Sequence, residues 1–139
     1  MLSALSGYVY NSLSDEGIPL FSEPISIESG SDISLEETYR LFLEGRVLFL
    51  DSRYREEYND GHIENALNLP ASASRDEIRS FLDNMPKNRL IITYCSNPSC
   101  NSSRRLAGLL MYLGYKNVFV YSGGYDEWLS HEYPNQVEN

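Results

Sequence analysis

Three short apolar runs constrain the fold of this chain more than any other feature. Residues 47–50 read VLFL, residues 90–95 read LIITYC and residues 117–121 read NVFVY. Runs of this length that are apolar throughout are typical of strands buried on both faces of a sheet. Helical segments separate these runs, and strands that alternate with helices form a parallel sheet through right-handed crossovers. The sequence therefore predicts an α/β fold.

Start and stop signals place the helices between the strands. Ser34 with Glu37, and Ser74 with Glu77, have the spacing of capping boxes, in which the two side chains bond to free backbone amides at a helix start. The first helix is expected to end at Gly45, since glycine readily adopts the backbone conformation that follows a helix.

The length of 139 residues suits one domain. Residues 1–32 do not share the alternation of strands and helices, so they are expected to form an N-terminal extension or linker. Within them, residues 17–21 and 24–27 are extended pieces that could lie along an edge of the sheet. The domain itself is expected to cover residues 33–134, and residues 135–139 to form a tail.

Charge and composition exclude several classes of function. The chain has 11 Lys and Arg against 20 Asp and Glu, a formal charge of -9, and shows no basic patch that would attract nucleic acid or anionic lipid. Its longest apolar run is far shorter than the ~20 residues that span a bilayer. Two cysteines and two histidines do not have the spacing of a zinc site. We expect a soluble domain that binds no metal and no nucleic acid.

Both cysteines lie in one polar loop, which reads YCSNPSCNSSRR from Tyr94 to Arg105. Cys95 ends a predicted strand, and a helix with Ser102 or Ser103 as its N-cap is expected to follow. In open α/β sheets ligands bind at the carboxyl ends of strands, and a helix N-terminus attracts anions and favours thiolate over thiol. An isolated cysteine is more often a small core residue, but this combination of strand, loop and helix start makes Cys95 the candidate nucleophile.

The rest of this loop is expected to bind an anion through its backbone amides, with Arg104 or Arg105 adding positive charge. Cys100 is either a second reactive thiol or a passive loop residue. The loop between the cysteines contains Pro98 and can bring their Cα atoms within the roughly 4.4 to 6.8 Å that a disulfide requires. A sulfenate or persulfide on Cys95 would then be open to attack by Cys100, so one hypothesis is a reversible bond that stops transfer and protects Cys95. The candidate substrate-binding residues are Ser96, Asn97, Ser99, Cys100, Asn101, Ser102, Ser103, Arg104 and Arg105.

Three motifs taken together resemble the rhodanese domain family. They are LFLDSRYREEYNDGHIENALNLP at 48–70, the unit of strand, Cys95, loop and helix, and GYKNVFVYSGGYDEW at 114–128. The resemblance implies an open parallel sheet of about five strands with helices on both faces. It also implies a cysteine that takes sulfane sulfur from thiosulfate or a protein persulfide donor and passes it to a thiol acceptor, with no metal or organic cofactor.

The cysteine loop departs from the common family pattern Cys-x-x-Gly-x-Arg-Ser. When Ser103 and Gly114 are aligned with that pattern, the loop is two residues longer and contains no arginine. Phosphatase relatives of the family carry a Cys-x5-Arg loop, but Asn101 and Leu106 occupy the positions where the arginine would be needed. Phosphatase and arsenate reductase chemistry are therefore disfavoured.

The remaining motif residues are expected to support the structure rather than to act as acids or bases. They are Asp51, Arg53, Glu57 and His62. The leading hypothesis is a thiosulfate or persulfide sulfurtransferase that works through a persulfide on Cys95. The alternative is a catalytically weak rhodanese-like module for binding or redox sensing, which uses the Cys95 and Cys100 pair. Residues 7–20 resemble the segment after a membrane helix in tethered relatives, so the soluble domain is expected to be either cytoplasmic or tethered by a segment outside this chain.

Overall fold

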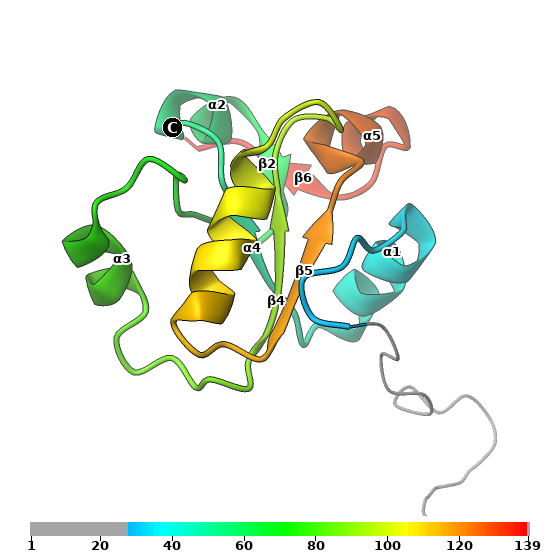
Figure 1. The fold of residues 1–139 in the computed structure, drawn as a ribbon. Helices are drawn as coiled ribbons and strands as arrows, with labels where there is room; N and C mark the ends of the chain where they lie inside the picture. The colour runs from blue at the N-terminus through cyan, green and yellow to red at the C-terminus, as the bar shows by residue number, and fades with distance from the viewer. Residues whose placement is uncertain (1–27, 139) are drawn as a thin grey trace, which may run out of the picture.

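The computed structural model describes residues 28–138, which fold around a sheet of four parallel strands (Figure 1). The strand order is β3-β1-β4-β5, and the strands are β1 (Leu48–Asp51), β3 (Leu67–Asn68), β4 (Leu90–Tyr94) and β5 (Asn117–Tyr121). The predicted α/β architecture is confirmed, with four strands in place of the expected five or so. The pieces at 17–21 and 24–27 lie outside the described residues.

The segment 29–33 runs beside β5 in place of a fifth strand. The amide of Gly30 donates to the carbonyl of Val118 at 2.6 Å, and the amide of Ile33 donates to the carbonyl of Val120 at 2.8 Å. Asp32 and Val120 form a parallel bridge. The segment that leads into the domain is therefore attached to the outer edge of β5.

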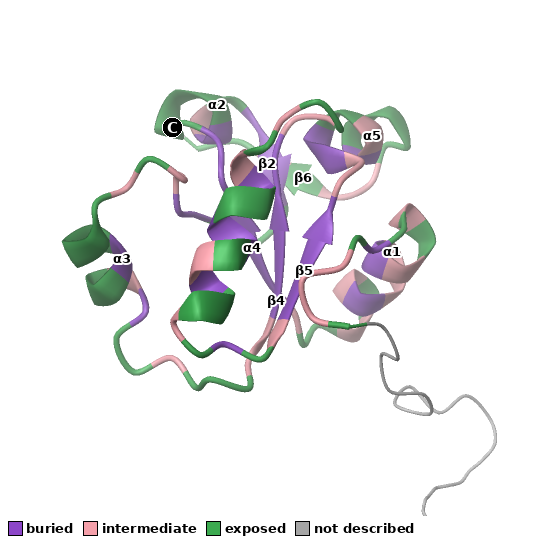
Figure 2. Cartoon of the chain, viewed as in Figure 1, coloured by how far each residue is buried: buried purple, intermediate pink, exposed green. Residues whose placement is uncertain are grey.

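Strands β1, β4 and β5 each contribute to two apolar cores, because successive side chains point to opposite faces of the sheet. One core lies under α3 (Arg75–Phe81) and α4 (Ser102–Tyr112), and the other under α1 (Leu35–Glu44) and α5 (Gly124–Ser130). Strand β1 is buried throughout and β4 and β5 are buried beyond their first residues, while the outer surfaces of the helices are exposed (Figure 2). The strand residues of the first core are Leu48, Leu50, Ile91, Val118 and Val120, and those of the second are Phe49, Ile92, Tyr94, Phe119 and Tyr121.

A second, two-stranded sheet closes one end of the domain. It pairs β2 (His62–Ile63), which follows α2 (Arg55–Asp60), with β6 (Asn135–Gln136) in antiparallel orientation. Residues 135 and 136, assigned to the tail from the sequence, thus belong to a strand. The amide of Glu138 extends this contact by donating to the carbonyl of Asn59 at 2.9 Å.

The two predicted capping boxes differ in the structure. At α3 the box is complete, because the Ser74 hydroxyl accepts from the amide of Glu77 and the Glu77 carboxylate accepts from the amide of Ser74. At α1 the Ser34 hydroxyl accepts from the amide of Glu37, but the carboxylate of Glu37 binds Arg40 instead. An arginine three positions further along the same helix face therefore competes for that carboxylate.

The ends of two helices bear directly on the sequence predictions. Helix α1 is followed by Gly45 with a φ of 76°, as predicted. Helix α4 begins at Ser102, and its N-cap is Asn101 rather than Ser102 or Ser103. None of the helices within residues 28–138 has the length and apolar composition of a membrane span.

Candidate active site

Cys95 lies where the carboxyl ends of β1 and β4 meet. The amide of Ser52, which follows β1, donates to the carbonyl of Tyr94 at 3.0 Å, and the Ser52 hydroxyl donates to the same carbonyl at 2.9 Å. Ser52 and Cys95 are therefore neighbours although they are far apart in the sequence. Both residues are buried, and Cys95 has only 5% of its surface exposed.

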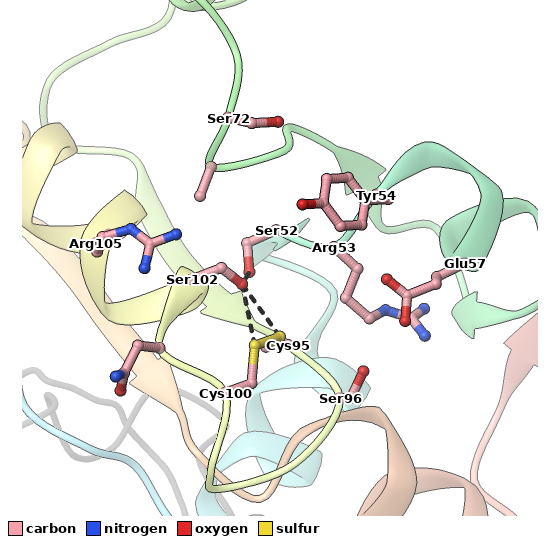
Figure 3. Close-up of a pocket in the computed structure, with 12 residues that line it drawn as sticks. Ser52, Arg53, Tyr54, Glu57, Ser72, Cys95, Ser96, Cys100, Ser102 and Arg105 are labelled. Atoms are coloured by element: carbon pink, nitrogen blue, oxygen red, sulfur yellow. Dashed lines mark hydrogen bonds between the residues drawn. A yellow bond between two sulfur atoms is a disulfide. The ribbon is translucent and has the colours of Figure 1, made fainter.

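The sulfur atoms of Cys95 and Cys100 are joined in a disulfide, with a Cα to Cα distance of 6.2 Å (Figure 3). The loop bends between them because the amide of Cys100 donates to the carbonyl of Asn97 at 3.1 Å. The structure thus brings the two thiols together, as the sequence suggested, and Cys100 faces Cys95 rather than pointing away as a bystander. Whether the bond regulates the protein stays a prediction.

The hydroxyl of Ser102 lies beside both sulfur atoms. Its Oγ is 3.1 Å from the Sγ of Cys95, 3.2 Å from the Sγ of Cys100 and 2.9 Å from the Oγ of Ser52. A hydroxyl in this position can donate to whichever neighbouring atom carries negative charge. Two hydroxyl groups, from the end of β1 and the start of α4, thus form a short chain that leads to the sulfur atoms.

A pocket of about 300 Å³ opens in front of the disulfide (Figure 3). Of the residues proposed from the sequence, Cys95, Ser96, Cys100, Asn101, Ser102, Arg105, Arg53 and Glu57 line it. Sequence reasoning missed Ser52, Tyr54, Ala71 and Ser72. The position of Ser52 between Asp51 and Arg53 in a recognised motif was the one available signal. No sequence signal marked Tyr54, Ala71 or Ser72, because their position in the pocket depends on how the loops after β1 and β3 meet.

Four proposed substrate-binding residues lie outside the pocket: Asn97, Ser99, Ser103 and Arg104. Asn97 shapes the loop, because its side-chain oxygen accepts from the amide of Ser99 at 3.0 Å. The amides of Ser99 and Cys100, expected to bind an anion, are thus used within the loop. Ser103 is buried, and its carbonyl accepts from the hydroxyl of Thr93 at 3.0 Å.

The two arginines at the start of α4 lie in different surroundings. Arg104 forms a salt bridge with Asp32, in which the closest nitrogen and oxygen atoms are 2.7 Å apart. Arg105 lines the pocket, and within the described residues it forms no ion pair. The positive charge that the sequence assigned to either arginine therefore comes from Arg105.

Arg53 is buried and holds the loop after β1 in place. Its guanidinium donates to both carboxylate oxygens of Asp51, at 3.0 and 2.8 Å, and to the carbonyl of Gly61 at 2.6 Å, and it lies 4.8 Å from the ring centroid of Tyr125. Burial opposes the charged form, but the hydrogen bonds and charge of Asp51 outweigh it and raise the pKa of Arg53. Glu57 lies beside Arg53 at the pocket wall (Figure 3), without an ion pair among the described residues. These contacts agree with the expected structural role.

His62 is fully buried and lies outside the pocket. Its Nδ1 is 2.7 Å from the carbonyl of Tyr58, so this nitrogen carries a proton and donates, and its ring stacks on that of Tyr58 at 3.8 Å. Its Nε2 is 3.3 Å from the carboxylate of Glu138. A supporting role, as expected from the sequence, fits this position.

The start of α5 holds the other side of the cysteine loop. The amides of Tyr125 and Asp126 donate to the carbonyls of Cys95 and Ser96, both at 2.9 Å. Gly124 has a φ of 75°, and a Cβ atom there would lie 2.6 Å from the carbonyl of Ser96. Only glycine allows the helix and the loop to approach so closely. The two glycines belong to the motif at 114–128, but the sequence did not predict this contact.

A family model described as the rhodanese-like domain matches residues 34–131. The chain belongs to the rhodanese-like domain family. A human single-domain sulfurtransferase is 26% identical, covers 71% of this chain and 95% of its own, and has a TM-score of 0.59. A rhodanese-like domain of an Anabaena protein is 30% identical, covers 67% of this chain and 94% of its own, and has a TM-score of 0.56. These similarities support a sulfurtransferase type of enzyme in general.

This rhodanese-like domain also resembles part of larger proteins. The tRNA uridine(34) hydroxylase of Erwinia tasmaniensis is 28% identical over 101 residues, which are 71% of this chain. The aligned region is only 28% of the length of that relative.

In this rhodanese-like domain, reduction of the disulfide would leave the sulfur of Cys95 at the base of the pocket. There it would have the hydroxyl of Ser102 beside it and the cation of Arg105 in the pocket wall. Preorganised donors and a positive charge of this kind stabilise a sulfur anion. The arrangement is thus suited to sulfur chemistry at Cys95.

Proposed function

We propose that this domain is a sulfurtransferase that carries sulfane sulfur as a persulfide on Cys95. The donor is thiosulfate or a protein persulfide, and the acceptor is a thiol. The observation that carries the proposal is the place of Cys95 at the base of a pocket where Ser102 contacts its sulfur and Arg105 adds a positive charge.

The pocket suits a small anion better than a large substrate. Its volume of about 300 Å³ is at the lower end for ligand sites. Its lining includes the hydroxyl groups of Ser72, Ser96 and Ser102, and hydroxyl groups can donate hydrogen bonds to oxyanions. A local cation in a chain of charge -9 further favours an anionic donor at this place over the rest of the surface.

Transfer takes place in two steps once the disulfide has been reduced. The Cys95 thiolate attacks the sulfane sulfur of thiosulfate, the bond between the two sulfur atoms of thiosulfate breaks, and sulfite leaves with the electron pair. A nucleophilic acceptor then attacks the outer sulfur of the persulfide and releases the Cys95 thiolate. Arg105 and the hydroxyl of Ser102 are placed to stabilise the charge in both steps.

The test follows thiocyanate formation from thiosulfate and cyanide by protein that has first been reduced. We expect activity from the parent and none from Cys95→Ser. A matched control is Tyr112→Phe on the exposed surface of α4, where the residue is 85% exposed, and it should behave like the parent. Unchanged activity of Cys95→Ser would end the proposal.

Comparison of donors refines the assignment. Mass spectrometry should show the gain of one sulfur atom on Cys95 after incubation with thiosulfate. Persulfide formation with a protein persulfide donor but not with thiosulfate would identify a carrier that depends on a dedicated partner, which the loop without arginine would explain.

The disulfide favours a second candidate function, a redox-sensing module. In this case Cys95 and Cys100 would exchange between thiols and disulfide without passing sulfur to an acceptor. Reversible oxidation by peroxide, together with no gain of sulfur from any donor, would support the sensor over the transferase.

The hydroxylases that share this domain act, by their name, on tRNA. We propose that RNA is not a ligand of this chain by itself, because its charge of -9 opposes binding to phosphates. A filter-binding assay with transfer RNA at low salt should show no retention. Retention that falls steeply with salt would overturn this proposal.

A further inference from the structure

The disulfide shows which atom of a Cys95 persulfide Cys100 can reach. The Sγ of Cys100 occupies a bonding position to the Sγ of Cys95, which would be the inner sulfur of a persulfide. Attack of a thiolate on the inner sulfur expels the outer sulfur, whereas attack on the outer sulfur only moves the persulfide to the attacking thiol. The disulfide in the structure is the bond that the first reaction would form.

We propose that this domain has a second activity, in which Cys100 resolves the Cys95 persulfide and releases its outer sulfur as hydrogen sulfide. The proposal rests on the proposed function in that Cys95 must carry a persulfide. It assigns Cys100 a part in the turnover itself, beyond the protection of an oxidised Cys95.

The step balances as a two-electron exchange. The Cys100 thiolate forms a bond to the Sγ of Cys95, the bond from that Sγ to the outer sulfur breaks, and the outer sulfur leaves with the electron pair as hydrosulfide, with a proton from solvent. The sulfane sulfur is reduced and the two thiols are oxidised to the disulfide. An external dithiol must then reduce the disulfide before another cycle begins.

The contacts around the sulfur atoms favour this reaction. The hydroxyl of Ser102 lies 3.1 Å from the Sγ of Cys95 and 3.2 Å from the Sγ of Cys100, so it can donate to the Cys100 thiolate before the attack. The carbonyl of Asn97 holds the amide of Cys100, and α5 holds the carbonyl of Cys95. The loop is thus fixed on both sides of the reacting pair, which lowers the entropic cost of bringing the thiols together.

The pocket gives both the donor and the leaving sulfide a path to solvent, because it opens on Cys95 and Cys100 together. An acceptor that enters this pocket attacks the outer sulfur and competes with Cys100. The fate of the sulfur therefore depends on the acceptor concentration: transfer prevails when the acceptor is abundant, and release of sulfide prevails when it is scarce.

The test uses reduced protein, freed of reductant, with one equivalent of thiosulfate and no acceptor. The parent should release sulfite and sulfide and lose two hydrogens in forming the disulfide. Cys100→Ser should release sulfite but keep the sulfur atom, with sulfide reduced at least about tenfold until dithiothreitol is added. Cys100→Ala provides a second variant with the same expected result. A stable persulfide on the parent, or equal sulfide from parent and variants, would overturn the proposal.

A second arm runs the reaction backwards without thiosulfate. Sodium sulfide added to the oxidised parent should place one sulfur atom on Cys95 and free the thiol of Cys100, as mapped by alkylation and fragment mass spectra. If neither the parent nor the variants release sulfite in the first arm, thiosulfate is rejected as the donor. The second arm still tests the role of Cys100, because it does not use thiosulfate. Sulfur on Cys95 then supports the resolving role of Cys100, and sulfur on Cys100 contradicts it.

Discussion

The hydroxyl group of Ser102 lies within hydrogen-bond distance of the sulfur atoms of Cys95 and Cys100. Removing this hydroxyl tests how much it assists persulfide formation on Cys95. We expect Ser102→Ala, in the reduced state, to form the persulfide about tenfold more slowly, because a hydrogen bond to a charged group contributes roughly 1.5 to 3 kcal/mol. Stopped-flow measurement of sulfite release gives the rate. Ser80→Ala on the exposed side of α3 is the matched control. Equal rates for the two variants would show that the hydroxyl does not assist.

Two adjacent arginines offer a matched pair for the charge of the pocket. Arg105→Gln should raise the KM for thiosulfate several-fold and weaken its dependence on salt, since an exposed charge contributes up to about 1 kcal/mol and is screened by ions. Arg104→Gln should leave the KM near that of the parent, because Arg104 pairs with Asp32 outside the pocket. A larger rise in KM for Arg104→Gln than for Arg105→Gln would show that Arg105 does not supply the charge of the pocket.

Single residues of the site were predictable from the sequence where a local pattern marks them. Cys95 ends an apolar strand before a helix, and this order alone indicates a reactive place. Ser52 was not predictable, because it meets Ser102 through the pairing of β1 with β4, across a sequence separation of 50 positions. The different positions of Arg104, paired with Asp32, and Arg105, in the pocket wall, depend on the direction in which each side chain leaves α4.

Helix α5 and the cysteine loop approach each other at Gly124, so this contact can be tested by adding one methyl group. Gly124→Ala should destabilise the domain by about 1 to 3 kcal/mol, because the positive φ disfavours alanine and the new Cβ would meet the backbone of Ser96. Urea denaturation of the reduced protein measures the effect, and the reaction of Cys95 with thiosulfate should slow as the loop shifts.

The control for Gly124→Ala is the single variant Gly108→Ala. Gly108 lies in α4, where an added Cβ meets nothing within 4 Å. Alanine should therefore be neutral or stabilise the helix by up to about 1 kcal/mol. If both variants unfold at the urea concentration of the parent, the loop does not depend on the close approach of α5.

At the level of elements, the apolar runs predicted three of the four strands of the main sheet, because a buried strand shows its burial locally, and the short segment ALNL before Pro70 indicated the fourth. The two-residue strands β2 and β6 are different, since each is held by a partner far away in the sequence. The attachment of residues 29–33 to β5 likewise depends on backbone groups rather than on an apolar pattern. Such pairing leaves little trace in the sequence.

Buried tyrosines link the stability of the whole molecule to alkaline pH. Burial is the main cause that raises the pKa of Tyr58, Tyr94, Tyr121 and Tyr125. In the unfolded chain these groups lose their protons near pH ~10, whereas in the folded state they keep them to higher pH. Their contribution to stability is therefore complete below about pH 10 and decreases as the pH rises further.

Urea midpoints between about pH 8 and 11 should thus be constant at first and then fall. Tyr121→Phe should reduce the slope of the fall, because one buried titrating group is removed. Tyr112→Phe, at a position 85% exposed, should leave the slope unchanged. A midpoint that stays constant to the highest pH would contradict the link.

The salt bridge between Arg104 and Asp32 has a mechanical consequence. Asp32 belongs to the segment that leads from the preceding chain into the sheet, and Arg104 precedes the pocket residue Arg105 in the first turn of α4. The ion pair thus connects the segment beside β5 to the helix turn that carries the cation of the pocket. Both side chains are about half exposed, so this connection resists a displacement of one segment against the other by up to about 1 kcal/mol.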